Sequence, residues 1–107
     1  MERYAWKAHV FPGKIEEYKK RHDEIWPEMI ELFKKAGVRN YSIWNIENDL
    51  FGYYECDNLE KARQIQEQSK VKKAWGQYMS DVMEMEKDPL TGETVQMRQV
   101  FMLDEEK

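Results

Sequence analysis

The sequence predicts one α+β domain, in which four β-strands and two helical regions follow each other in the order βαββαβ. Short segments rich in aromatic and β-branched residues predict the strands, and two longer segments with apolar residues at steps of three and four predict the helices. With 107 residues, 41% of them apolar and 36% charged, the chain suits one hydrophobic core and does not resemble a disordered segment. We therefore expect residues 1–107 to form a single domain.

The first predicted strand covers residues 3–11 and ends at Pro12 and Gly13. Every second side chain on it is apolar, which is typical of a strand with one buried face. These inward side chains are Tyr4, Trp6, Ala8 and Val10. His9 falls on the opposite, polar face and is read as a surface residue.

The first helical region runs from Ile15 to Gly37. Its inward stripe consists of Ile15, Tyr18, His22, Ile25, Met29, Leu32 and Ala36. Pro27 lacks a backbone N–H and disfavours helical geometry at Trp26, so we expect a kink or a restart near residues 25–27. Gly37 suits the left-handed conformation that caps a helix.

The second half of the chain supplies the remaining elements. Residues 40–46 and 50–56 predict two strands joined by the polar turn "END". A helical region from about residue 58, opened by a capping box of Asp57 and Glu60, is expected to divide near Ser69 into two short helices or to continue as one. Residues 94–103 alternate in the manner of a last strand.

This order most simply gives a ferredoxin-like fold, a four-stranded antiparallel sheet with the helices on one face. The predicted strands at 40–46 and 50–56 carry large apolar side chains on both faces, including Trp44 and Phe51. A monomer would leave one of these faces uncovered. We therefore expect a homodimer with two-fold symmetry in which the sheets pack together, a dimeric α+β barrel.

Composition excludes several classes of function. The net charge of −4 disfavours nucleic acid as a partner, and no apolar run approaches a signal peptide or a membrane span. A lone cysteine, Cys56, allows no intrachain disulfide and has no visible cation to activate it, so we expect an inert thiol in a cytoplasmic protein. Short metal-ligand spacings and glycine-rich phosphate loops are absent, and we expect no metal site.

His22 is the main candidate for chemistry. It points inward, and Tyr18 lies one helical turn before it on the same stripe. One interpretation is a core histidine satisfied by a backbone carbonyl. The other is a proton-transfer group acting on a neutral polyhydroxylated ligand, because imidazole both gives and takes protons near neutral pH and aromatic faces stack on sugar rings.

The chain resembles the L-rhamnose mutarotase family over nearly its whole length. The most specific match is "EEYKKRHDEIWPE", which follows the family pattern E-Y-x-x-R-H-x-x-I-W-P-E. Further matches follow in order: "NYSI" at residues 40–43, "WGQYMSDVM" at residues 75–83 and "QVF" at residues 99–101.

The resemblance implies a dimeric ferredoxin-like isomerase that interconverts the α and β anomers of a 6-deoxy aldohexopyranose without a cofactor. It implies His22 as the proton donor and Tyr18, Tyr41 and Trp75 as the sugar-binding residues. Three further charged residues match the pattern, and for these we expect a role in the fold: Arg21, Glu28 and Asp81.

Two positions depart from the family pattern, so the preferred sugar stays open. Gly76 follows Trp75 where the family commonly has a second tryptophan, and Gln99 replaces a frequent glutamate. Two other functions also fit the sequence: a ferredoxin-like module that binds a small ligand without turnover, and a dimeric α+β barrel monooxygenase or isomerase for aromatic or enone substrates.

Overall fold

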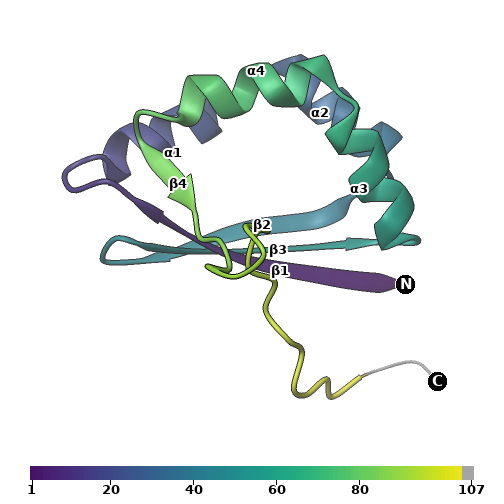
Figure 1. Ribbon diagram of the computed structural model, residues 1–107. Helices are drawn as coiled ribbons and strands as arrows, with labels where there is room; N and C mark the ends of the chain where they lie inside the picture. Colours follow the sequence, from purple (N-terminus) through teal and green to yellow (C-terminus); the bar gives the residue numbers. More distant parts are fainter. Residues whose placement is uncertain (105–107) are drawn as a thin grey trace.

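The computed structural model describes residues 1–104; the last three residues of the expected domain lie outside the described part. The elements are β1 (Glu2–Val10), α1 (Ile15–Asp23), α2 (Pro27–Lys35), β2 (Arg39–Ile46), β3 (Asp49–Cys56), α3 (Leu59–Glu67), α4 (Lys70–Met79) and β4 (Met83–Met85) (Figure 1). The predicted βαββαβ order is confirmed, with each helical region divided in two.

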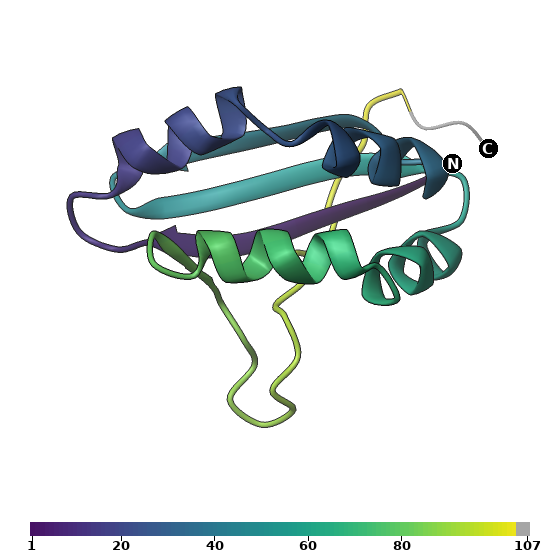
Figure 2. The ribbon, with the colours of Figure 1, turned by 90° about the horizontal axis from the view of Figure 1, so that it is seen from above.

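The four strands form one antiparallel sheet in the order β2-β3-β1-β4. The helices lie over one face of this sheet, and the other face carries no helix (Figures 1 and 2). This is the predicted ferredoxin-like arrangement, in which the two crossover connections place their helices on the same side.

Both helical regions divide where the sequence indicates. Trp26 is extended, with φ −61° and ψ 136°, and Pro27 occupies the first turn of α2, where its missing N–H removes no helical hydrogen bond. Ser69 opens α4 by accepting a hydrogen bond from the backbone N–H of Lys72. The capping box predicted at Asp57 is wrong, because the cap of α3 is Asn58, which accepts from the backbone N–H of Lys61 at 3.0 Å.

The last strand also differs from the prediction. β4 is Met83–Met85, where the sequence predicts no strand, and it pairs with β1 next to Val10. Residues 94–97 touch the sheet only through isolated contacts, such as the hydrogen bond from the Met97 N–H to the Ala5 carbonyl at 2.7 Å. Residues 98–104 then leave the sheet and extend beyond its uncovered face (Figure 1).

The core lies between the helices and the sheet. The side chains that point from β1 and β3 toward the helices are buried, including Ala8, Val10 and Leu50. The uncovered face behaves differently: Trp44 and Ile46 of β2 are 69% and 63% exposed. The inward and outward faces expected from alternation are therefore both present.

Candidate active site

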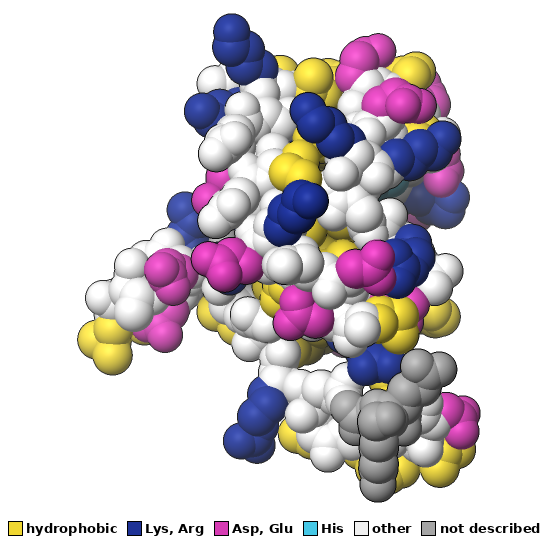
Figure 3. All heavy atoms as spheres, turned by 90° about the vertical axis from the view of Figure 1, so that its right-hand side faces the viewer, with side chains coloured by type: hydrophobic (Ala, Val, Ile, Leu, Met, Phe, Trp, Pro, Cys, Tyr) yellow, Lys and Arg dark blue, Asp and Glu magenta, His cyan; other side chains and the backbone are white. Residues whose placement is uncertain are grey.

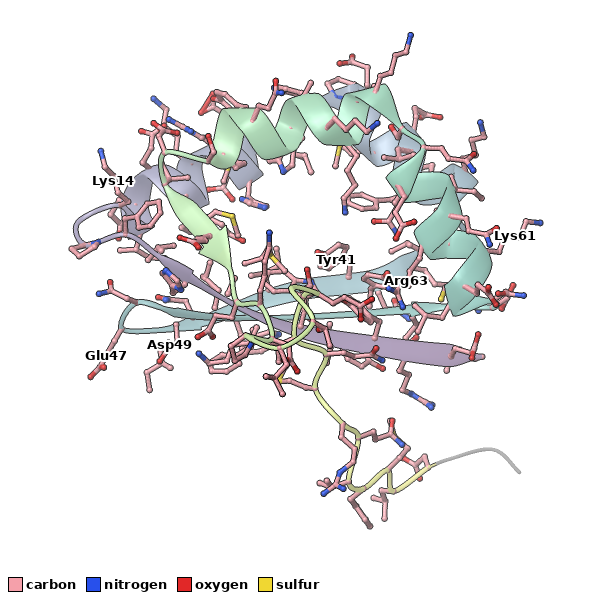
Figure 4. The ribbon with its side chains drawn as sticks, in the orientation of Figure 1. Lys14, Tyr41, Glu47, Asp49, Lys61 and Arg63 are labelled. Carbon is pink, nitrogen blue, oxygen red and sulfur yellow. The ribbon has the colours of Figure 1, made fainter. Side chains whose placement is uncertain are left out.

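A cavity of about 1350 Å³ opens between the helical layer and the inner face of the sheet. The predicted site residues all line it, although they come from three elements: Tyr18 and His22 from α1, Tyr41 from β2 and Trp75 from α4. Figure 4 shows Tyr41 on the helix side of the sheet. Pockets for small molecules are concave, mostly apolar and furnished with a few polar groups, and this cavity fits that description.

His22 uses one ring nitrogen for structure and keeps the other free. Its Nδ1 lies 3.1 Å from the Tyr18 carbonyl oxygen, one helical turn back, so Nδ1–H donates to that oxygen. Among the described residues, Nε2 has no protein partner, and the side chain lines the cavity. Burial lowers the pKa of His22, and the hydrogen bond to the Tyr18 carbonyl opposes that shift. The resting imidazole is therefore neutral at pH 7, with a lone pair on Nε2.

Aromatic rings fix the orientation of this imidazole. The Tyr18 ring lies 4.3 Å from the His22 ring between centroids, and the Trp75 ring meets it edge-on at 5.5 Å. Trp75 is held in turn by Trp26, edge-on at 5.0 Å. The restart at Pro27 places Trp26 in this contact, which connects the break between α1 and α2 to the geometry of the site.

Trp6 and Gly52 position Tyr41, and sequence reasoning did not assign either to the site. The Trp6 indole N–H donates to the Tyr41 hydroxyl at 3.0 Å. Gly52 faces Trp6 across the β1–β3 pair, and a Cβ on Gly52 would lie 2.0–2.3 Å from indole atoms. Only glycine lets the indole lie flat on β3 and reach Tyr41. The signal in the sequence was a glycine inside an aromatic strand, which often marks a close approach.

The two tyrosines of the site are hydrogen-bonding groups, not bases. Burial raises the pKa of Tyr18 and of Tyr41 far above the usual phenol value. Both hydroxyls therefore stay protonated at neutral pH. Because the Tyr41 oxygen already accepts the indole N–H, its own hydrogen is available to a ligand in the cavity.

Comparison with known proteins identifies the family of this chain. Residues 3–103 match the family model described as L-rhamnose mutarotase. The chain belongs to the L-rhamnose mutarotase family. It is 40% identical over 106 residues to the L-rhamnose mutarotase of Lachnoclostridium phytofermentans, covering 97% of this chain and all of the relative. The L-rhamnose mutarotase of Listeria monocytogenes is 39% identical over 105 residues, covering 96% of this chain and 99% of the relative.

Solved structures show the same fold. The crystal structure of an L-rhamnose mutarotase from Formosa agariphila superposes with a TM-score of 0.78 at 30% identity, covering 97% of this chain and all of that one. Tetracenomycin F2 cyclase from Streptomyces glaucescens superposes with a TM-score of 0.69 at 12% identity, over 99% of this chain and all of the cyclase. At that identity the cyclase shows a shared fold only.

The charged residues of the family motif support the fold. Arg21 donates to Asp81 at 2.8 Å and to Glu17 at 2.7 Å, which ties α1 to the segment after α4. Its guanidinium also lies 4.5 Å from the centroid of the Tyr78 ring. Glu28 lies in the first turn of α2, where a carboxylate complements the helix dipole. None of the three motif residues Arg21, Glu28 and Asp81 is among the residues that line the cavity.

The two departures from the family pattern lie in different places. Gly76 lines the cavity beside Trp75, and no atom lies within 4 Å of the position that a Cβ would take. A larger side chain would therefore have room at this position. Gln99 is exposed, after the point where the chain leaves the sheet, and does not line the cavity.

Cys56 and His9, the other two side chains that could react, do not line the cavity. Cys56 is fully buried, and burial raises the pKa of its thiol, as expected of an inert cysteine. His9 lies on the polar face of β1, beside Phe11.

In residues 1–104, no helix has the length and apolar character needed to cross a membrane. The same residues contain no group of three or more His, Cys, Asp and Glu that could hold a metal ion.

Proposed function

We propose that this protein interconverts the α and β anomers of L-rhamnose or a closely related 6-deoxy aldose, with His22 as the proton-transfer residue. The observation that carries the proposal is the free Nε2 of a neutral imidazole in the cavity of a member of the L-rhamnose mutarotase family. The activity makes the protein an isomerase that needs no cofactor for the chemistry, because the reaction only moves protons and opens and closes one C–O bond.

The mechanism is a proton shuttle through one nitrogen. Neutral Nε2 of His22 takes the proton of the anomeric hydroxyl and then, as imidazolium, gives it to the ring oxygen while the bond from the anomeric carbon to that oxygen breaks. The product is the open-chain aldehyde. Rotation about the adjacent C–C bond presents the other carbonyl face, and the same steps in reverse close the ring as the opposite anomer. The imidazole returns to its neutral form.

The tyrosines and Trp75 orient the sugar for this exchange. The Tyr18 and Tyr41 hydroxyls, both protonated, hydrogen-bond the sugar hydroxyls, and the Tyr18 ring packs against the His22 ring at 4.3 Å between centroids. Trp75 stacks on the apolar face of the ring and holds His22 edge-on. The assignment of sugar-binding roles to Tyr18, Tyr41 and Trp75 rests on their shared cavity and on the family motif.

The test is anomer exchange measured by saturation-transfer NMR on L-rhamnose. We expect the wild type to speed exchange and His22→Ala to lose this acceleration while it stays folded. General acid or base catalysis by one group contributes a factor of roughly a hundred to ten thousand, which sets the size of the loss. His9→Ala is the matched control, because His9 lies on the other face of the sheet and its loss should leave the rate unchanged.

The same experiment separates the two other functions. A ligand-binding module would bind the sugar without speeding exchange, and an enzyme for aromatic or enone substrates would do neither. The family match, which spans residues 3–103, favours neither of them. Equal exchange rates for the wild type and His22→Ala would overturn the role of His22.

We also propose that the protein works in the cytoplasm as a homodimer. The uncovered face of the sheet carries Trp44 and Ile46, and the segment beyond it carries Val100, Phe101 and Leu103, which are 75–81% exposed. Soluble proteins rarely leave such a surface open, and a second copy of this chain would cover it. The lone thiol of Cys56, which forms no disulfide, suits a reducing compartment.

A further inference from the structure

The cavity is larger than one monosaccharide requires. Its volume, about 1350 Å³, exceeds the roughly 300–1,000 Å³ of pockets that hold drug-sized ligands. His22, Tyr18 and Trp75 occupy only part of the lining. One end of the cavity is formed by α3, the first turn of α4 and the ends of β1 and β3 near them. We name it the cationic end, and its residues are Tyr4, Tyr54, Arg63, Gln66, Glu67, Lys72 and Lys73.

Lys72 supplies a cation whose partner is neutral. Its Nζ donates to Oε1 of Gln66 at 3.0 Å, and Nε2 of Gln66 donates to the Ala62 carbonyl at 3.2 Å and lies 3.5 Å from the Tyr54 hydroxyl. Lys72 is an exposed residue, although partial burial of its ammonium group lowers its pKa and the charge of Glu67 opposes that shift. An amide oxygen satisfies one ammonium hydrogen and leaves the charge uncompensated.

Arg63 supplies a second cation beside the same tyrosines. It extends from α3 into the space between the helices and the sheet, whereas Lys61 of the same helix points outward (Figure 4). Burial raises the pKa of Tyr4 and of Tyr54, and the positive charge of Arg63 opposes the shift in both, which places the guanidinium near both phenols. Seen from the α3 side, Lys and Arg side chains lie over the helical part of the surface, with apolar side chains between them and Asp and Glu side chains beside and below them (Figure 3).

Carboxylates do not neutralise these cations. Glu67 lies near enough to raise the pKa of Lys72, but no ion pair among residues 1–104 involves Arg63 or Lys72. The other carboxylates that line the cavity belong to α1 and to the segment after β4. Arg63 and Lys72 are both exposed and lack an ion-pair partner among the described residues, so an anionic ligand group at this end would give each of them a charge-assisted hydrogen bond.

A row of three tyrosine rings, Tyr41, Tyr54 and Tyr4, leads to the cationic end of the cavity. The ring centroids of Tyr41 and Tyr54 are 5.1 Å apart, and those of Tyr54 and Tyr4 are 5.2 Å apart. Tyr41 is therefore the junction between the two parts of the cavity. His22, Tyr41 and Tyr54 line the same cavity, so a substituent that follows the tyrosines away from His22 leads toward Arg63 and Lys72.

We propose that the cationic end binds the carboxylate or phosphate of a larger saccharide, whose reducing-end 6-deoxy aldose lies at His22. Arg63 and Lys72 bind the anion, and the Tyr4 and Tyr54 hydroxyls donate to it. This inference rests on the proposed function and extends its substrate class from a neutral monosaccharide to an acidic saccharide with a free anomeric carbon. The neutral monosaccharide uses only the His22 part of the cavity.

The test compares two disaccharides that share a reducing-end L-rhamnose. One carries a hexuronic acid as its second unit and the other the corresponding neutral hexose. We expect the KM for anomer exchange of the acidic disaccharide to be about tenfold lower than that of the neutral one, because a charge-assisted pair adds binding that the neutral hexose lacks. Arg63→Gln and Lys72→Met should raise the acidic KM toward the neutral one and leave exchange of L-rhamnose unchanged. Lys61→Gln is the matched control, since Lys61 points away from the cavity.

Equal KM values for the two disaccharides in the wild type would overturn the proposal, even if both variants failed to fold. The proposal would also be overturned if the KM for the acidic disaccharide stayed lower than that for the neutral one in Arg63→Gln and Lys72→Met. If the wild type speeds no anomer exchange at all, the proposed function fails, and the cationic end is then tested by calorimetric binding of the same two disaccharides. Tighter binding of the acidic one, lost in the variants, would support the cationic end independently of turnover.

Discussion

His22 combines the two interpretations that its sequence position left open. Its spacing relative to Ile15, Tyr18 and Ile25 predicts that it points inward, and it does so. Sequence could not indicate which nitrogen is free, because that depends on the hydrogen bond from Nδ1 to the Tyr18 carbonyl. The histidine is satisfied by a backbone carbonyl at one nitrogen and available for chemistry at the other.

The place of Tyr41 in the site could not be predicted from the residues of its own strand. Its place in the site was implied only by the family motif, since nothing in the alternation of its strand distinguishes it from neighbouring aromatics. The structure gives the physical reason: Trp6 donates to its hydroxyl, and Gly52 makes room for Trp6. Trp6 lies 35 residues from Tyr41 in the sequence, so local pattern could not reveal this contact.

Gly52→Ala should damage both stability and binding. The new methyl group would overlap the Trp6 indole, and overpacking of this kind costs about 1–3 kcal/mol of unfolding free energy. Displacement of the indole would also break its hydrogen bond to Tyr41. We expect a lower midpoint in urea and a raised KM for L-rhamnose. Gly13→Ala is the comparison for an exposed glycine with open space around it, and its loss of stability should come from its backbone conformation without any change in KM.

At the scale of elements, the breaks in the helices were predictable because proline and serine act locally. Pro27 restarts one helical region and Ser69 caps the last helix, and both effects depend on the residue itself and its immediate neighbours. The error at Asp57 was a shift by one residue between two good capping side chains. The last strand was mispredicted because the alternation in residues 94–103 continues where the chain has no strand to pair with.

The cap of α3 provides a test of this local account. Asn58→Ala should lower the unfolding free energy by about 1 kcal/mol, since it leaves the Lys61 N–H without its acceptor. Asp57→Ala should cost less, because Asp57 only forms an exposed ion pair with Arg39. Urea denaturation of both variants checks this, and a larger loss for Asp57→Ala would show that the cap is misassigned.

At the scale of the whole molecule, the uncovered sheet face was predicted from the presence of large apolar residues on both faces of two strands. Trp44 is the most exposed aromatic side chain of that face, at 69%. Trp44→Glu should therefore weaken association of the proposed dimer, because it places a charge where a second copy would bury an indole. Sedimentation velocity over a range of concentrations measures the change.

Leu90→Glu is the matched control for Trp44→Glu. Leu90 is 94% exposed but lies in the turn after β4, away from the sheet face. We expect it to leave the association state unchanged. A wild type that sediments as a monomer at every concentration would contradict the dimer, and a dimer that tolerates Trp44→Glu would place the interface elsewhere.

Neutral His22 begins the proposed proton shuttle. The most direct test compares the pH profile of kcat/KM with the NMR titration of the His22 ring. Burial holds the pKa of His22 below the usual 6.5, so the neutral form persists at pH 7 and is lost as the pH falls through that lowered value. We expect kcat/KM for L-rhamnose to be flat near neutrality and to fall on acidification, with the same midpoint as the NMR titration of the His22 ring. A rate that rises as His22 gains its proton, or a midpoint unrelated to that titration, would contradict the account.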